Sequence, residues 1–351
     1  MKKYPAYYFP ALLYKKEKNK TVRCQVCERR CLIGPGKTGF CRARKNINGQ
    51  LYTLNYGLIA AAGNDPIEKK PLFHFYPGSL SFSIGTIGCN FRCRFCQNWD
   101  IAYTDTSQIE NKELNPKTTD PQEIVKAALA GGAKSIAFTY NEPTIWLEYV
   151  LEVMKQAKKA HLFTVWVTNG YATKKTIDLI APYLDVWRVD LKSFEDRFYQ
   201  KLIAVPHAKP VFENTFYLKK KYPQVHIETV TNIIPGWNDN QENLQKIARF
   251  IAQKLGKKTP WHITRFFPAA QMKDIPPTPI ETLFQAKTIG QRAGLNFVYL
   301  GNVAIPEEEN TYCPHCGALC IKRTGYQVKI LKVDKKGHCS VCGTSLNIKI
   351  Q

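Results

Sequence analysis

A repeating alternation of apolar, β-branched runs with longer amphipathic segments constrains the fold of this 351-residue chain more than any other feature. The alternation begins at Leu80 and continues to about residue 300. Apolar strands that alternate with helices are typical of parallel β/α units, whose sheet is covered on both faces. We expect strands at 80–87, 135–140, 163–168, 185–191, 225–234, 262–267 and 296–300, and helices at 122–130, 144–160 and 240–255. The pattern predicts an α/β fold, with six or seven units in a closed or partial barrel.

Polar side chains follow several of these strands at their carboxyl ends, where parallel α/β folds place their sites. Glu142 follows the second strand, and Thr168 and Asn169 follow the third. Asp190 and Lys192 end the fourth strand and, at a spacing of two, share one face of the sheet. Each fragment alone is more typical of a turn or a surface pair. Their recurrence at successive strand ends indicates a site on this rim.

The first of these strand ends carries three cysteines, Cys89, Cys93 and Cys96, with the spacing C-x3-C-x2-C. Three soft ligands within eight residues indicate a metal centre. A structural zinc site needs a fourth ligand, and none follows within the next few residues. Three thiolates on a [4Fe–4S] cluster leave one iron open to a small molecule. The spacing favours such a cluster over zinc with a distant fourth ligand and over a chance group of buried thiols.

The other nine cysteines form one group near each end of the chain. The N-terminal group is Cys24, Cys27, Cys31 and Cys41. Its four thiolates could hold zinc or a second [4Fe–4S] cluster, and the sequence does not decide between them. Unligated thiols are the third alternative. Twelve cysteines in a chain with no secretory pattern favour metal sites over disulfides.

The C-terminal group consists of two C-x2-C-G knuckles around a basic, β-rich insert. Its members are Cys313, Cys316, Cys339 and Cys342. Four thiolates in this arrangement predict a zinc ribbon. Cys320 is then surplus, and we expect it to be a small apolar residue. His74, between two phenylalanines, is expected to be structural.

The cysteine groups suggest three domains along the chain. We expect a Cys-rich metal-binding segment at residues 1–48, the β/α barrel at 49–308 and a zinc-ribbon-like module at 309–351, with a linker at 307–310. No stretch reaches about 18 uncharged apolar residues, which predicts the absence of a transmembrane helix. The N-terminus lacks the apolar run of a signal peptide, so we expect a cytoplasmic protein.

The formal net charge is +22, and the first 50 residues hold 13 Lys and Arg against two Glu. A basic surface attracts nucleic acid, anionic membranes and acidic proteins alike. A lysine-rich thermophile surface would give the same composition. The sign of the charge therefore names no partner.

With these motifs in place, the chain resembles radical S-adenosylmethionine (SAM) enzymes of the glycyl-radical-activase type. It is most similar to the radical SAM component of the AmmeMemoRadiSam system, which is encoded alongside Memo-like and AMMECR-like proteins. The motifs that carry the resemblance are S-I-G-T-I-G-C-N-F-R-C-R-F-C-Q-N-W at 83–99, F-T-Y-N-E-P-T at 138–144, T-N-G-Y at 168–171, D-L-K at 190–192 and the terminal C-P-H-C-G…C-G. The resemblance implies a partial (β/α)6 barrel.

The resemblance also implies a cofactor set and a reaction. Cys89, Cys93 and Cys96 would hold a [4Fe–4S] cluster, and SAM would chelate its fourth iron. The residues expected to contact SAM are Glu142, Thr168, Asn169, Asp190 and Lys192. A flavodoxin- or ferredoxin-like donor would reduce the cluster, and reductive cleavage of SAM would give methionine and a 5′-deoxyadenosyl radical. That radical would abstract hydrogen from a substrate, in activases a backbone glycine of a partner protein.

Three departures from the activase pattern bear on the substrate. Tyr140 and Asn141 replace paired glycines before Glu142, and Val167 replaces an Asp that precedes Thr-Asn-Gly in activases. The sixth strand ends in F-F-P-A instead of L-P-Y-H, so a SAM-contacting histidine has no match, and His262 does not simply replace it. Three functions remain: a radical SAM enzyme acting on a protein, one modifying RNA or a small molecule, and a metal-stapled binding protein without catalysis.

Overall fold

The computed structural model describes residues 4–106 and 117–350. Residues 1–3 of the predicted N-terminal segment 1–48 lie outside the described residues. By its internal contacts the chain divides into two compact units. The first contains the chain up to Asn64, then Ser81–Asp185 and Leu202–Val205. The second contains Asp65–Leu80, Val186–Lys201 and the chain from Pro206 onward. The domain boundaries expected at residues 48 and 308 stay a prediction.

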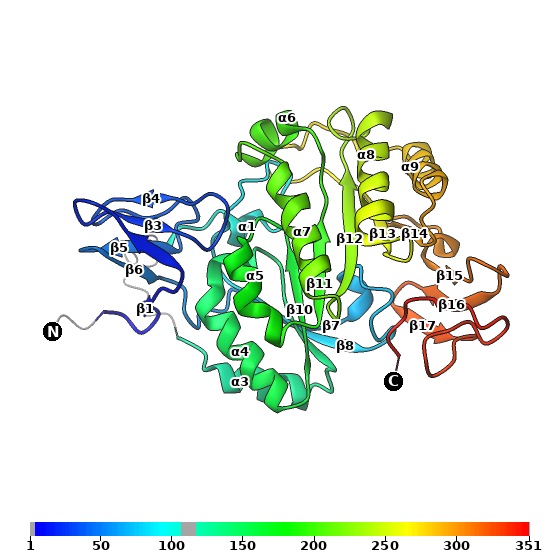
Figure 1. Ribbon diagram of the computed structural model, residues 1–351, viewed down its shortest axis with the longest axis horizontal. Coiled ribbons are helices and arrows are strands. Elements are labelled where there is room, and N and C mark those ends of the chain that lie inside the picture. The colour runs from blue at the N-terminus through cyan, green and yellow to red at the C-terminus, as the bar shows by residue number, and fades with distance from the viewer. Residues whose placement is uncertain (1–3, 107–116, 351) are drawn as a thin grey trace. The chain divides into compact units, whose positions relative to one another are not determined.

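An eight-stranded sheet with the order β14-β13-β12-β11-β10-β9-β8-β7 is the centre of the fold (Figure 1). Its strands are β7 (Ala61–Pro66), β8 (Leu80–Gly85), β9 (Ser135–Phe138), β10 (Phe163–Thr168), β11 (Val186–Asp190), β12 (His226–Ile233), β13 (Trp261–Arg265) and β14 (Val298–Gly301). The pairs β8–β9, β9–β10, β11–β12, β12–β13 and β13–β14 are all parallel. The structure confirms the predicted α/β class and each predicted strand, with ends that differ by at most two residues.

In the first unit, β8, β9 and β10 stand in register at Ser81, Ser135 and Phe163. Every residue of β9 is buried, as expected for a strand covered on both faces. The helices of this unit are α1 (Trp99–Ala102), α3 (Pro121–Ala130), α4 (Leu147–Lys159) and α5 (Lys174–Ile180). Asp120 and Glu123 form a capping box that starts α3. Helix α3 packs on β9 and α4, and α4 packs on β10.

The N-terminal residues form two small antiparallel sheets in the first unit. One has the order β1-β6-β5 and the other β2-β3-β4. Their strands are β1 (Phe9–Pro10), β2 (Tyr14–Lys16), β3 (Val22–Cys24), β4 (Leu32–Ile33), β5 (Arg44–Ile47) and β6 (Gln50–Thr53). Cys24 ends β3, and the other three cysteines of the N-terminal group lie in the loops between β3 and β5.

In the second unit, helices follow the strands β11, β12 and β13 (Figure 1). They are α6 (Asp196–Phe198), α7 (Lys209–Lys221), α8 (Gln241–Phe250) and α9 (Ile280–Arg292). Helix α9 packs on β13, β14 and α8. Asn240 caps α8, and the helix continues as a single π-helical stretch, Ile251–Leu255, so that the predicted helix 240–255 is present in two geometries. No helix in residues 4–106 or 117–350 is both long and apolar enough to cross a bilayer.

The C-terminal module is an antiparallel sheet of β15 (Thr311–Tyr312), β16 (Leu319–Thr324) and β17 (Gln327–Ile330). Its buried residues form one hydrophobic cluster with Phe73 and Tyr299. The linker expected at 307–310 is largely a 3-10 helix, Pro306–Glu309. Asn310 accepts a hydrogen bond from the Arg323 amide at 2.6 Å and so joins the helix to β16. The segment is therefore ordered and tied to the module that follows, and its role as a linker between domains stays a prediction.

Candidate functional site

The loop after β8, residues 86–98, carries Cys89, Cys93 and Cys96, and we call it the thiol loop. Asn141 holds the start of this loop at the end of β9. Its Nδ2 donates to the carbonyls of Thr86 at 2.9 Å and Gly88 at 2.7 Å. Asn98, at the end of the loop, donates to the Tyr140 carbonyl at 2.6 Å. The Tyr140-Asn141 pair, which departs from the activase pattern, thus fixes both ends of the thiol loop.

The cysteines of the thiol loop lie at different depths. Cys89 is buried, and Cys93 and Cys96 are half-buried. The Phe91 amide donates to Cys89 Sγ at 3.4 Å. Burial, then the Cys93 thiol and the Glu142 carboxylate, raise the pKa of Cys89 well above its usual value. A cationic metal centre would offset this cost, because metal binding stabilises the thiolate.

Glu142 is fully buried at the end of β9, and its carboxylate receives four donors. Thr168 Oγ1 lies 2.9 and 3.0 Å from the two carboxylate oxygens, and the Asn169 amide donates at 2.8 Å. The amide of Thr144 donates at 3.1 Å, and its hydroxyl is also bonded to the carboxylate. Burial raises the pKa of Glu142, while these hydrogen bonds act in the opposite direction. The structure thus brings Glu142, Thr168 and Asn169 together.

The predicted contact of Glu142 with SAM stays a prediction. A carboxylate offers about four lone-pair sites, and protein donors occupy that number here. An ammonium group of SAM would have to replace one of them or share an oxygen. Glu142 in this structure therefore positions the turn after β10.

Asn90 is a site residue that we did not single out from the sequence. Its Oδ1 accepts a hydrogen bond from Asn169 Nδ2 at 2.7 Å, which joins the thiol loop to the turn after β10. Arg29 Nε donates to the Asn90 carbonyl at 2.5 Å, which joins the same loop to the N-terminal segment. The only signal in the sequence is its place next to Cys89, since a single Asn has no periodicity or spacing of its own.

Asp190 and Lys192 lie at the end of β11 in the second unit and form an ion pair of 2.7 Å. Arg188 is a second partner of Asp190. Burial raises the pKa of Asp190, but Arg188 and Lys192 outweigh it and lower the pKa below its usual value. Lys192 is held by its backbone as well, because its carbonyl accepts from Asn238 Nδ2 at 2.7 Å. The predicted shared face is consistent with this pair, and a role toward SAM stays a prediction.

The N-terminal group surrounds a pocket of the first unit. All four of its cysteines line the pocket, together with Arg44 and Asn90. Arg44 is buried and bonded to the Glu148 carboxylate at 2.7 and 3.0 Å. Cys27 pairs with Ala172 in an isolated antiparallel bridge, and the Glu28 amide donates to the Tyr171 carbonyl at 2.9 Å. The group is therefore fixed to the T-N-G-Y turn that carries Asn169.

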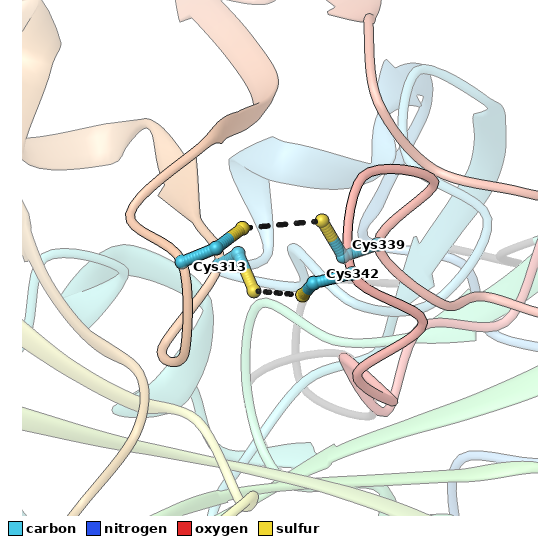
Figure 2. Close-up of side chains that lie close together, drawn as sticks. Cys313, Cys339 and Cys342 are labelled. Carbon is cyan, nitrogen blue, oxygen red and sulfur yellow. Dashed lines mark hydrogen bonds between the residues drawn. The ribbon is translucent and has the colours of Figure 1, made fainter.

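The C-terminal group has a different geometry, shown in Figure 2. All four Sγ atoms lie within 4.8 Å of one another. The Sγ atoms of Cys313 and Cys342 are 3.5 Å apart, and those of Cys316 and Cys339 are 3.7 Å apart. Among the described residues, this is the one set of three or more His, Cys, Asp or Glu ligands gathered so closely. It could hold a single metal ion, because tetrahedral Zn–S bonds of about 2.3 Å need sulfurs at such separations.

Cys320, His74 and His262 lie outside these groups. Cys320 is buried in β16, as expected for a small apolar residue. His74 bonds the Leu346 carbonyl at 2.9 Å and the Tyr299 hydroxyl at 2.7 Å, which supports the structural role expected for it. His262 bonds the buried Glu228 carboxylate at 2.7 Å.

Comparison with known proteins identifies the class. The family model described as "Radical SAM superfamily" matches residues 83–251, which include the thiol loop, Glu142, Asn169 and Asp190. An uncharacterized protein of Methanocaldococcus jannaschii is 41% identical over 339 residues, or 96% of this chain and 98% of that protein. The chain belongs to the radical SAM superfamily. Membership implies a [4Fe–4S] cluster and SAM, and the donor set of three thiols in one loop fits such a cluster.

More distant relatives include activating enzymes. The pyruvate formate-lyase 1-activating enzyme of Escherichia coli strain K12 is 25% identical over 46% of this chain and 65% of its own length. The isethionate sulfite-lyase activating enzyme of Oleidesulfovibrio alaskensis is 27% identical over 38% of this chain and 42% of its own. Among solved structures, a radical SAM methyltransferase from Sphaerobacter thermophilus gives a TM-score of 0.48 at 17% identity, over 70% of this chain and 71% of that one.

Proposed function

We propose that this protein cleaves SAM reductively and uses the resulting radical to abstract hydrogen from a partner protein. The observation that carries the proposal is the thiol loop, whose three cysteines lie at the carboxyl end of β8 beside the Glu142 network. A [4Fe–4S] cluster held by Cys89, Cys93 and Cys96 would supply one electron to the sulfonium and so break the S–C5′ bond. The cluster provides this chemistry, and the protein provides binding, orientation and exclusion of water.

The side chains around the thiol loop act as positioning groups in this proposal. Asn141 and Asn98 fix the ends of the loop, and Asn90 ties its centre to Asn169. Glu142 in turn holds the backbone amide of Asn169. Because the bonds of Asn90 and Glu142 are buried and those of Asn141 and Asn98 are partly buried, we expect the loop geometry to be set before SAM binds. Glu142, Thr168 and Asn169, and from β11 Asp190 and Lys192, are the proposed SAM contacts.

The activating enzymes among the relatives support a protein as the substrate. The AmmeMemoRadiSam resemblance directs the test to Memo-like and AMMECR-like proteins, with a flavodoxin- or ferredoxin-like donor. The C-terminal group is proposed to hold a structural zinc ion, because its sulfurs are spaced for a single ion. The basic N-terminal segment could bind phosphate groups, so RNA is included in the same test as an alternative substrate.

The first experiment measures 5′-deoxyadenosine after anaerobic incubation of reconstituted protein with SAM and dithionite. We expect formation by the natural protein and by Cys320→Ala, which removes a buried thiol outside all three groups. We expect a loss of at least about 100-fold in Cys89→Ala, because the open iron requires all three ligands. Equal product from Cys89→Ala and the natural protein would overturn the proposal.

The second experiment identifies the substrate. A Memo-like or AMMECR-like protein labelled with deuterium at its glycine α-carbons is added, and transfer of deuterium into 5′-deoxyadenosine is measured by mass spectrometry. Transfer supports a protein substrate. If RNA increases the formation of 5′-deoxyadenosine and neither labelled protein transfers deuterium, the substrate is RNA and not a protein.

A further inference from the structure

We propose that the N-terminal group, Cys24, Cys27, Cys31 and Cys41, holds a second [4Fe–4S] cluster that relays single electrons to the thiol loop. The relay half of this proposal rests on the proposed function, whereas the identity of the metal centre does not. Cys24 ends β3, Cys27 and Cys31 lie in the loop between β3 and β4, and Cys41 lies in the loop between β4 and β5, yet all four line one pocket of the first unit.

The N-terminal and C-terminal cysteine groups differ in the spacing of their sulfur atoms. In the C-terminal group four Sγ atoms lie within 4.8 Å, as a single ion requires. No three ligand atoms of the N-terminal group meet that limit, although all four of these residues are described and all four face one pocket. A cluster of four irons with one thiolate on each holds its ligands farther apart than one ion does. The open ring of sulfurs around a pocket therefore favours the cluster over zinc.

Two buried donors without partners line the same pocket. Asn90 Nδ2 and Arg44 Nε are buried, and neither has a hydrogen-bond partner in the described structure. A buried N–H group without an acceptor has lost its water and gained no partner, which destabilises the fold, so each needs an explanation. A tetrathiolate cluster carries net negative charge and accepts N–H···S hydrogen bonds at its sulfurs. Both donors fit such a ligand, and Glu148 holds Arg44 in place from the other side.

The N-terminal group also meets the thiol loop directly. Asn90 lines the pocket and is bonded through the main chain to Cys89. Gly88 precedes Cys89 in the chain, and a Cβ added to Gly88 would lie 2.7 Å from the Cys41 carbonyl oxygen, so the two backbones touch. The Arg29 guanidinium stacks 3.3 Å over the Phe40 ring and bonds the Asn90 carbonyl. A cluster that accepts a hydrogen bond from Asn90 Nδ2 would therefore be linked to Cys89 by that hydrogen bond and a few covalent bonds.

The relay needs one electron per SAM and no proton. An external one-electron donor of the flavodoxin or ferredoxin class would be oxidised once and would reduce a cluster held by the N-terminal group from 2+ to 1+. The same electron would then pass to the cluster held by the thiol loop, which would return the first cluster to 2+. Cleavage of SAM would consume this electron and return the thiol-loop cluster to 2+.

The metal content of the full-length protein, purified and reconstituted without oxygen, tests the first half. We expect about eight iron atoms and one zinc per chain. Cys27→Ala is expected to retain about four iron and the zinc, whereas Cys316→Ala is expected to retain the iron and lose the zinc. About four iron and two zinc in the natural protein would overturn a second cluster, as would unchanged iron in Cys27→Ala.

Electron paramagnetic resonance separates this proposal from the proposed function. In Cys27→Ala the remaining reduced cluster is expected to keep a signal that changes when SAM is added. In Cys93→Ala the SAM-sensitive signal is expected to disappear while about four iron remain. If the SAM-sensitive signal survives in Cys93→Ala, the proposed function fails and the second cluster does not.

The rate of cluster reduction tests the relay. In Cys27→Ala, the rate at which a flavodoxin reduces the thiol-loop cluster is expected to fall at least about tenfold, because the N-terminal cluster that would receive the electron first is missing. The rate with dithionite is expected to fall less. Equal rates with flavodoxin in Cys27→Ala and the natural protein would overturn the relay.

Asn90→Asp provides a test that keeps all twelve cysteines. It retains the oxygen that accepts from Asn169 and replaces the unpartnered donor by an acidic oxygen. We expect unchanged iron content and a more negative midpoint potential of the SAM-insensitive cluster. The control is Asn55→Asp, because the Asn55 side chain is also buried with an unpartnered Nδ2 but does not line the pocket. An equal shift in the control, or no shift in Asn90→Asp, would overturn the contact with the cluster.

Discussion

Single buried polar side chains hold the thiol loop in place. Asn90, Asn141 and Glu142 each join segments that are far apart in the sequence, through hydrogen bonds to backbone groups or to short polar side chains. Buried polar networks of this kind fix one geometry, because a partly satisfied group is costly in a low dielectric. The thiol loop therefore owes its position to residues that carry no metal themselves.

His74 gives a prediction for the pH dependence of stability. Burial lowers its pKa to about 3, whereas an unfolded histidine titrates near 6.5. The native state binds fewer protons than the unfolded state below pH 6.5, so His74 stabilises the fold above that pH and loses its contribution as the pH falls toward 3. The expected slope from this residue is up to about 1.4 kcal/mol per pH unit. Urea unfolding of the natural protein and His74→Gln between pH 7 and pH 5 measures it.

The control for this prediction is His161→Gln, since His161 is exposed. We expect the pH slope to decrease in His74→Gln and to stay unchanged in His161→Gln. Thiol groups that protonate in the same range contribute to all three proteins and cancel in the comparison. The same slope in His74→Gln and the natural protein would contradict the prediction.

Among the loops, the thiol loop depends on one backbone position. Gly88 has φ +84°, a conformation that L side chains rarely adopt, and a Cβ there would lie 2.7 Å from the Cys41 carbonyl oxygen. Gly88→Ala is therefore expected to cost about 1–2 kcal/mol for the left-handed backbone and roughly 1–3 kcal/mol more for the clash. We also expect loss of iron from the thiol loop, measured after anaerobic reconstitution.

Gly132→Ala is the matched control for this substitution. Gly132 has φ +67°, but nothing lies within 4 Å of an added Cβ. It shares the backbone strain and lacks the clash, so its cost in unfolding free energy should be smaller and its iron content unchanged. If both variants bind iron equally, the contact of Gly88 with Cys41 is not what positions the loop.

The predicted elements differ in how well the sequence could define them. Strand β10 was predicted with its observed bounds, Phe163–Thr168, because an apolar run bounded by polar turns is a local signal. The charge pattern of the segment 307–310 is local, whereas its hydrogen bond to Arg323 comes from β16 and could not be predicted from that pattern. The small N-terminal sheets have strands of two to four residues, too short for any periodicity to appear.

The distribution of charge over the chain gives the last prediction. Of a net charge of +22, the first 50 residues carry 13 cations against two Glu. An acidic electron donor should therefore be steered to the N-terminal segment. We expect the second-order rate of reduction by a flavodoxin to fall roughly tenfold at low salt when three exposed lysines of this segment are reversed, and the difference to vanish at about 1 M salt. The variant carries Lys15→Glu, Lys16→Glu and Lys18→Glu.

The control for this prediction reverses three exposed lysines of the C-terminal module instead, Lys329, Lys332 and Lys335. Both variants have the same net charge, so any difference in rate reports the position of the charges. Stopped-flow bleaching of the cluster absorbance measures the rates. An equal loss of rate in the two variants would show that net charge alone governs the encounter.

The sequence by itself determined the parallel α/β class and the three cysteine groups, because both are written in local spacing: the period of apolar residues and the intervals between thiols. Only the tertiary structure decided how the sulfurs of each group are arranged. The C-terminal sulfurs converge within 4.8 Å, while the N-terminal sulfurs surround a pocket with Arg44 and Asn90. These arrangements depend on contacts such as Asn90 with Asn169 and Arg44 with Glu148, which join residues 79 and 104 positions apart. No local pattern encodes such contacts, because they form only when the sheet and its loops pack together.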